Sequence, residues 1–172
     1  MERFFIDKQN RTVTISTTPR KRNRLPDGTF DVILKEKWNQ AMEDGVFLHK
    51  MDSVVRHFES ERGWVGVFCP SRIEKKRPAP NFQTVKTPFP TGFNFTKVRE
   101  EEKLFEIEND GIVYDVIVNN SPYEYGHSLI IPEPDKLHPQ ILNAATVETA
   151  LEIMMQSNQV GLRLMFNSGS VV

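Results

Sequence analysis

Residues 116–132 read VIVNNSPYEYGHSLIIP, and this stretch decides the fold that the chain is expected to adopt. An apolar run ends at Val118, a polar turn containing a proline follows, and a second apolar run extends from Ser128 to Ile131. Branched and apolar side chains bounded by Asn, Ser, Pro and Gly are typical of strands joined by a loop. The stretch therefore predicts two neighbouring strands of a sheet.

The residues before this stretch are expected to form a hairpin. Residues 103–108 and 112–118 flank the triplet Asn-Asp-Gly at positions 109–111. An Asp-Gly pair readily adopts the positive φ angles of a tight turn between antiparallel strands. A further strand is predicted over residues 63–69, and the proline-rich residues 70–90 are expected to be irregular.

Two amphipathic helices complete the predicted fold. The first begins near Thr29, which can cap it, and ends near Gly45. The second follows the sequence Pro-Glu-Pro at positions 132–134 and leads to a third strand over residues 161–167. One face of it is expected to consist of Ala144, Val147, Leu151, Met154 and Met155. These elements predict an α+β fold with a mainly antiparallel sheet and packed helices.

Composition and charge exclude several classes of protein. The 22 Lys and Arg nearly balance the 23 Asp and Glu, which argues against a protein that mainly neutralises nucleic-acid phosphates. The sequence contains no run of about 20 apolar residues, so no membrane partner is expected. The single cysteine, Cys69, cannot form an internal disulfide, and a cytoplasmic protein is predicted. Residues 1–28 are expected to form a flexible basic arm, because the run at 19–24 lacks helical or strand periodicity.

Residues 116–132 resemble the first half of a histidine-triad (HIT) domain, in which an apolar strand is followed by Ser-Pro, a Gly-His pair and a strand that ends in proline. Two further segments narrow the resemblance: FNFTKV at 93–98 and RLMFNS at 163–168. Together the three segments resemble the GDP-hexose phosphorylases, and the GDP-D-glucose phosphorylase branch most closely. The resemblance extends from about Phe30 to Ser168.

The resemblance implies a nucleotidyl transfer. In that family a histidine of a His-x-His-x-His motif attacks the α-phosphate of a GDP-hexose, and the guanylyl-histidine then passes GMP to inorganic phosphate. The implied partners are GDP-D-glucose, inorganic phosphate and GDP, and no cofactor is expected. The motif would follow Ser168, after which four residues remain. Residues 29–172 are therefore expected to be the N-terminal part of a HIT-like domain without the triad, and no catalytic residue is assigned.

The resemblance also implies three nucleotide-binding residues. Asn119 would lie against the ribose, Asn167 near the ribose and phosphate, and Lys97 near a phosphate. Each has a structural alternative, since Asn119 also suits a turn, Asn167 the end of a strand, and Lys97 a solvated surface. His127 is first interpreted as a structural histidine at the start of a strand.

Two other functions stay open. The chain can be a catalytically inactive interaction module that binds a partner, including the full-length enzyme. It can also be a general nucleotide hydrolase, although the segment FNFTK at 93–97 argues against this class. Pairing of two copies is an expectation by analogy with histidine-triad proteins.

Overall fold

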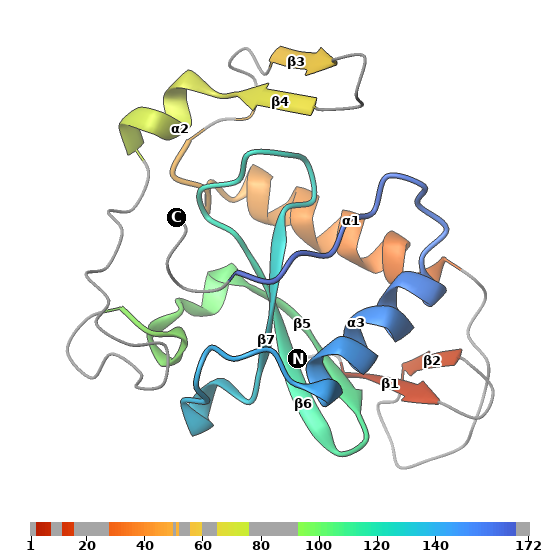
Figure 1. Cartoon of the computed structure of the whole chain (residues 1–172). Helices are drawn as coiled ribbons and strands as arrows, with labels where there is room; N and C mark the ends of the chain where they lie inside the picture. The colour runs from red at the N-terminus through yellow and green to blue at the C-terminus, as the bar shows by residue number, and fades with distance from the viewer. Residues whose placement is uncertain are drawn as a thin grey trace.

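The computed structural model describes residues 3–7, 12–15, 28–49, 51, 56–59, 65–75 and 93–167. Within them a five-stranded sheet packs against two helices, α1 (Thr29–Glu43) and α3 (Ala144–Gln156) (Figure 1). A second sheet pairs β3 (Arg56–Glu59) with β4 (Val65–Phe68). The predicted α+β class with a mainly antiparallel sheet is confirmed. No helix in this part of the chain is long and apolar enough to cross a membrane.

The centre of the large sheet is the predicted hairpin. Strands β5 (Lys103–Asn109) and β6 (Ile112–Val118) are antiparallel, and Asp110 and Gly111 between them have φ angles of 50° and 78°. Two successive positive φ angles give a turn whose twist matches that of the strands. Strand β7 (Ser128–Pro132) then pairs antiparallel with β6, as residues 116–132 predict.

Two strands near the N-terminus extend the sheet on the other side. Strand β1 (Arg3–Asp7) lies parallel to β5 and antiparallel to β2 (Thr12–Ile15), so that the strand order is β2-β1-β5-β6-β7. These residues were expected to belong to a mobile arm. The backbone edge of β5 supplies hydrogen-bond partners that no side-chain pattern reveals. The basic run at 19–24 lies outside the described residues, and its mobility stays a prediction.

Helix α1 agrees with the sequence except at its start. Gly28 is the N-cap residue and Thr29 is already helical, so the predicted capping role of Thr29 is wrong. The predicted end is confirmed: Gly45 has a φ of 71°, and Val46 N–H donates to the Ala41 carbonyl at 3.0 Å. The buried side of α1 packs Phe30 edge-on against Phe105, with 6.0 Å between ring centroids.

Helix α3 lies where it was predicted, but the side that meets the sheet is not the predicted apolar face. The side chains that face the sheet belong to Thr149 and Ile153, which are buried. Thr149 Oγ1 accepts a hydrogen bond from Asn109 Nδ2 at 2.8 Å and donates one to Tyr114 Oη at 3.0 Å. The five residues of the predicted face (Ala144, Val147, Leu151, Met154 and Met155) are exposed. The inward side of the helix is thus fixed to the sheet by a buried polar cluster as well as by Ile153.

The expected third strand is also wrong. Residues 161–167 form no strand, and the N–H of Leu162 makes a turn with the carbonyl of Gln159 at 3.0 Å. Leu162 and Leu164 are half-buried between exposed neighbours. The alternating pattern therefore predicts which side chains are exposed, but a strand also needs a backbone partner.

The segment after β4 begins with a short helix. Helix α2 (Pro70–Lys75) occupies the start of the stretch that was expected to be irregular, and residues 76–92 lie outside the described part. Proline fits the first turn of a helix, where its missing N–H costs no hydrogen bond. The predicted strand over residues 63–69 is confirmed for Val65–Phe68, whereas β3 was not predicted.

Candidate functional site

The candidate site is the loop of residues 119–127 between β6 and β7. Its two ends are joined where Asn119 N–H donates to the His127 carbonyl at 3.1 Å. Within it, His127 N–H donates to the carbonyl of Glu124 at 3.2 Å and closes a turn. Trp38 of α1 approaches the same His127 carbonyl with its Nε1 at 3.4 Å. The loop is therefore a hydrogen-bonded unit held on α1.

The carboxamide of Asn119 is fixed on both sides. Its Oδ1 accepts a hydrogen bond from the backbone N–H of Ser121 at 3.1 Å. This contact turns Nδ2 toward the imidazole of His127, whose Nε2 is 3.1 Å away. An asparagine that bonds the backbone two residues ahead is typical of a turn. The turn-forming role of Asn119 is thus realised, and one hydrogen of Nδ2 and one lone pair of Oδ1 remain for a ligand.

His127 is held in its neutral form. Burial, with a smaller contribution from the positive charge of Arg72, lowers its pKa from 6.5 to about 4. Asn119 Nδ2 lies 3.1 Å from Nε2 and Tyr123 N lies 3.4 Å from Nδ1, and because the neutral ring carries one hydrogen, only one of its two nitrogens accepts a hydrogen bond. A protonated ring would turn its own N–H groups toward these donors. The sequence-based interpretation of His127 as structural agrees with this geometry.

Arg72 joins the loop from helix α2. Its Nε donates to the carbonyl of Ser121 at 2.9 Å, and its guanidinium carbon lies 5.7 Å from the centre of the Tyr123 ring. The Tyr123 ring in turn lies 4.2 Å from that of His127, centroid to centroid. A cation over an aromatic face is attracted to it. The site therefore has one positive charge next to a neutral imidazole.

Two buried polar groups beside Arg72 lack partners. Both ring nitrogens of His49 and the hydroxyl of Ser121 make no hydrogen bond in the part of the chain that the structure describes. Burial is the largest cause of the lowered pKa of His49, and the positive charges of Arg72 and Lys75 lower this pKa as well. The backbone of Pro122 acts in the opposite direction and raises it. These atoms are enclosed, so a ligand reaches them only if the loop moves.

The far side of the loop is anchored by a buried polar chain. Asn120 Nδ2 donates to Glu102 Oε2 at 3.3 Å, and Arg99 Nε donates to Glu102 Oε1 at 2.6 Å. Arg99 also reaches the carbonyl of Val46 at 3.2 Å, while Leu48 N–H donates to the Asn120 carbonyl at 2.7 Å. A buried carboxylate that is paired in this way costs little and orders its neighbours. These residues hold the loop against the segment after α1.

The three predicted binding residues lie on three different elements. Asn119 belongs to the loop; Lys97 is exposed in the short 3-10 helix Phe95–Lys97. Asn167 is exposed, and its carbonyl accepts a hydrogen bond from the side chain of Gln140. Its alternative role at the end of a strand is excluded, because no strand forms there. The segment before Asn167 does reach the loop, since Tyr123 Oη lies 3.9 Å from Met165 Sδ.

Sequence reasoning missed Arg72 and His49. Arg72 belongs to a basic run, and His49 follows an apolar residue after the first helix, so neither has a local signal of function. Arg72 contacts Ser121, which lies 49 positions later in the sequence, and His49 contacts Pro122, which is still more distant.

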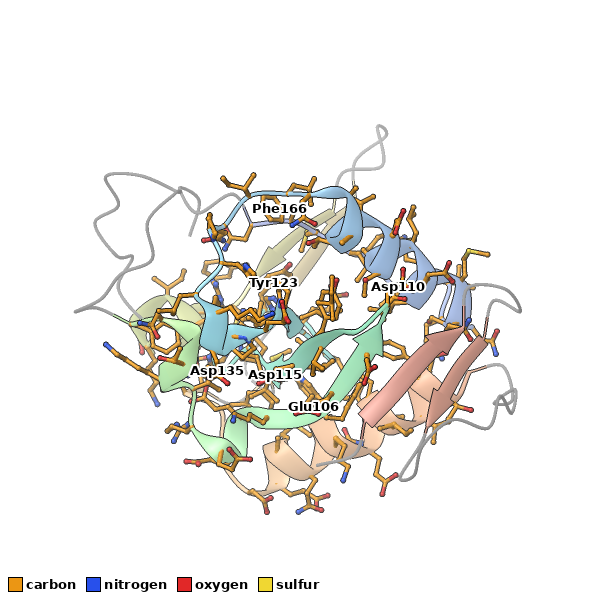
Figure 2. The ribbon with its side chains drawn as sticks, turned by 90° about the horizontal axis from the view of Figure 1, so that it is seen from below. Glu106, Asp110, Asp115, Tyr123, Asp135 and Phe166 are labelled. Atoms are coloured by element: carbon orange, nitrogen blue, oxygen red, sulfur yellow. The ribbon has the colours of Figure 1, made fainter. Side chains whose placement is uncertain are left out.

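A row of carboxylates lies on the other face of the sheet. Figure 2 shows Glu106, Asp115 and Asp135 in this row, and Glu106 and Asp115 are direct partners across β5 and β6. Burial is the largest cause of the raised pKa of Asp115, and the negative charges of Glu106 and Asp135 raise this pKa as well. The positive charge of Lys103 partly offsets the increase. Within the described part of the chain, no group of His, Cys, Asp and Glu has the arrangement of a metal site.

The loop is therefore suited to binding rather than to covalent chemistry. Its imidazole is neutral and lies between two N–H groups, the guanidinium of Arg72 lies beside it, and the loop itself carries the exposed carboxylate of Glu124. Backbone and amide groups around a positive charge can bind a polar, anionic ligand.

Comparisons with known proteins identify the family. Residues 29–172 match the family described as "GDPGP1-like, N-terminal domain". The chain is 34% identical to GDP-D-glucose phosphorylase 1 of Danio rerio over 142 residues, which cover 81% of this chain and 41% of the relative. It is 32% identical to the Homo sapiens protein of the same name, over 84% of this chain and 40% of the relative.

More distant relatives include GDP-L-galactose phosphorylase 2 of Arabidopsis thaliana, which is 27% identical over 77% of this chain and 36% of its own length. No solved structure matches the chain. The chain thus spans about two-fifths of the length of the first relatives named here. With a match that covers 144 residues, from 29 to 172, the chain belongs to the GDPGP1-like family through its N-terminal domain.

Proposed function

We propose that this chain is the nucleotide-binding part of a GDP-hexose phosphorylase. The reaction converts GDP-D-glucose and inorganic phosphate to GDP and glucose 1-phosphate by way of a guanylyl-histidine. The observation that carries the proposal is the match to the family's N-terminal domain, together with relatives named GDP-D-glucose phosphorylase 1. The expected partners are GDP-D-glucose, phosphate and GDP, in the cytoplasm.

Asn119 is the binding residue that the geometry supports best. Its amide is held by Ser121 and His127, so a ligand would meet a side chain that is already oriented. The free hydrogen of Nδ2 and the free lone pair of Oδ1 suit two ribose hydroxyls, each of which can donate and accept. Lys97 and Asn167 are proposed to approach the phosphates from their exposed positions.

The histidines described here are poorly placed to act as the nucleophile. His127 is enclosed by donors, and His49 is buried. His138 is exposed, and its Nε2 lies 3.0 Å from Glu133 Oε2. A nucleophilic imidazole must present a free nitrogen to the α-phosphate. We therefore propose that the histidine motif comes from another part of the full-length family protein, and that this chain alone binds nucleotide without turnover.

Titration calorimetry with GDP and with ADP tests the binding role. Asn119→Ala should weaken GDP binding by about 0.5–1.5 kcal/mol, the worth of one neutral hydrogen bond. Asn158→Ala, which truncates an exposed asparagine away from the loop, should leave GDP binding unchanged. Undetectable binding of both nucleotides, or equal loss in the two variants, would remove the assignment of Asn119.

GDP-glucose labelled in the α-phosphate tests the catalytic role. The chain alone should acquire no acid-labile label and release no glucose 1-phosphate. Joining it to the histidine-motif segment of a family member should restore both, and the same fusion with the nucleophilic histidine changed to alanine should restore neither. Phosphorolysis by the 172-residue chain alone would contradict the division of roles and direct attention to His127.

The second candidate function is an inactive interaction module. It is favoured by the exposed apolar side of helix α3, which offers a surface to another polypeptide. In this case the chain would bind a partner and would not distinguish GDP from ADP. A homo-oligomer is also a proposal, and the mass of the chain in solution tests it.

A further inference from the structure

One side of helix α3 carries four apolar side chains that nothing in the described structure covers. Val147, Leu151, Met154 and Met155 are between 38% and 55% exposed. Their positions are spaced by three and four residues, so they form one stripe along the helix. We call these four residues the α3 stripe.

The composition of α3 indicates that both sides of the helix should be covered. Its sequence, AATVETALEIMMQ, places apolar residues both in the stripe and on the side of Ile153, with Glu148 and Glu152 between these two sides. The side opposite the stripe is already packed, since Thr149 and Ile153 are 2% and 1% exposed. The helix therefore meets the sheet on one side and leaves a second apolar side for another surface.

The chain after α3 carries two more exposed apolar side chains. Met165 and Phe166 are 73% and 43% exposed, although they follow a segment that returns to the 119–127 loop. Exposed large apolar side chains on consecutive elements are typical of a surface that is buried in an assembly.

The charges of α3 argue against a second copy as the occupant. The charged residues of the helix are Glu148 and Glu152, and the helix has no Lys or Arg. Two copies that met through α3 would bring four carboxylates together without a basic residue from either helix.

The relatives indicate the occupant. The matching family is an N-terminal domain, and the Danio rerio and Homo sapiens relatives extend over more than twice the length that this chain covers. We propose that the α3 stripe is the docking surface for the part of the family protein that lies outside its N-terminal domain. The docking partner would present an apolar centre with basic residues at its edge, opposite Glu148 and Glu152.

Co-expression tests this proposal with the full 172-residue chain. The probe is the part of the Danio rerio relative that follows its N-terminal domain, carrying an affinity tag. Size exclusion with light scattering should show a complex of one copy of each chain. Leu151→Glu and Met155→Glu should weaken the complex by at least about tenfold, because each places a charge in the apolar centre. Met42→Glu, the same change as Met155→Glu at an exposed methionine of α1, should leave it intact.

Thermal unfolding of each variant alone shows whether the changes act on binding or on folding. The stripe is solvent-exposed in the chain by itself, so Leu151→Glu should melt close to the unchanged protein. Failure to form the complex, or a complex that Leu151→Glu and Met42→Glu weaken equally, would overturn the proposal. A homodimer of the 172-residue chain that Leu151→Glu dissociates would also overturn it, because the stripe would then belong to a second copy.

Discussion

Removing the imidazole of His127 should make the protein less sensitive to acid. In the folded chain this ring is neutral, lies 4.2 Å from the ring of Tyr123 and faces N–H groups at both nitrogens. His127→Phe keeps an aromatic ring beside Tyr123 but removes the group that can bind a proton. The comparison of the two proteins across pH therefore isolates the protonation of one side chain.

The sign and size follow from the lowered pKa. Burial, assisted by Arg72, lowers the pKa of His127 from 6.5 to about 4, so the unfolded chain binds this proton more readily than the folded one. The contribution of the neutral ring to stability is then fully present above pH 6.5 and is lost as the pH falls toward 4. A shift from 6.5 to about 4 corresponds to a loss of up to about 3 kcal/mol of unfolding free energy between pH 7.5 and pH 4.

Urea unfolding at several pH values between 7.5 and 4 measures this loss. The carboxylates and His49 titrate in both proteins, so their contributions cancel in the difference between unchanged protein and variant. That difference should shift by up to about 3 kcal/mol in favour of the variant as the pH falls. A direct NMR titration of the His127 ring should give a midpoint near pH 4.

Two results would refute this reasoning. A difference between the proteins that stays constant from pH 7.5 to 4 would mean that His127 does not titrate differently on folding. An NMR midpoint at or above 6.5 would mean that the ring is solvated or paired with an acid, contrary to the contacts with Asn119 and Tyr123.

Three further changes test other parts of the fold. Asp115→Asn should stabilise the protein at pH 7, because burial raises the pKa of Asp115 and disfavours its charged form in the folded state. This gain in unfolding free energy should disappear at low pH, where Asp115 is protonated, and an unchanged gain at pH 3 would contradict the reasoning. Thr149→Val should cost about 1–3 kcal/mol by leaving buried Asn109 and Tyr114 without their partner, and Thr149→Ser should restore most of it in urea unfolding. Gly111→Ala should cost about 1–2 kcal/mol from its φ of 78° alone, since no atom lies within 4 Å of the added methyl group, and a neutral effect on the melting temperature would argue against the turn.

The same contacts show how much of the candidate site is readable from sequence. Asn119 could be found because a polar residue at the end of an apolar strand has a local signal. Arg72 could not, because its contact with Ser121 joins residues 49 positions apart. His127 was interpreted as structural from its place at the start of a strand, but its lowered pKa depends on burial and on Arg72, neither of which is a property of its neighbours in sequence.

Local chemistry by itself determined the elements whose geometry is set within a few residues. The Asp-Gly turn at 110–111, the strands on either side of it and the glycine end of α1 all follow from backbone preferences of single residues. The family resemblance also rests on sequence motifs alone, and the match over residues 29–172 confirms it.

Only the tertiary structure decided which surfaces meet. Helix α3 has apolar residues on more than one side, and the side that meets the sheet is the one on which Thr149 bonds to Asn109 and Tyr114. Residues 161–167 alternate like a strand but lack a backbone partner, whereas β1 finds one at the edge of β5. Periodicity describes one segment at a time, while burial and strand pairing depend on what the rest of the chain places beside that segment.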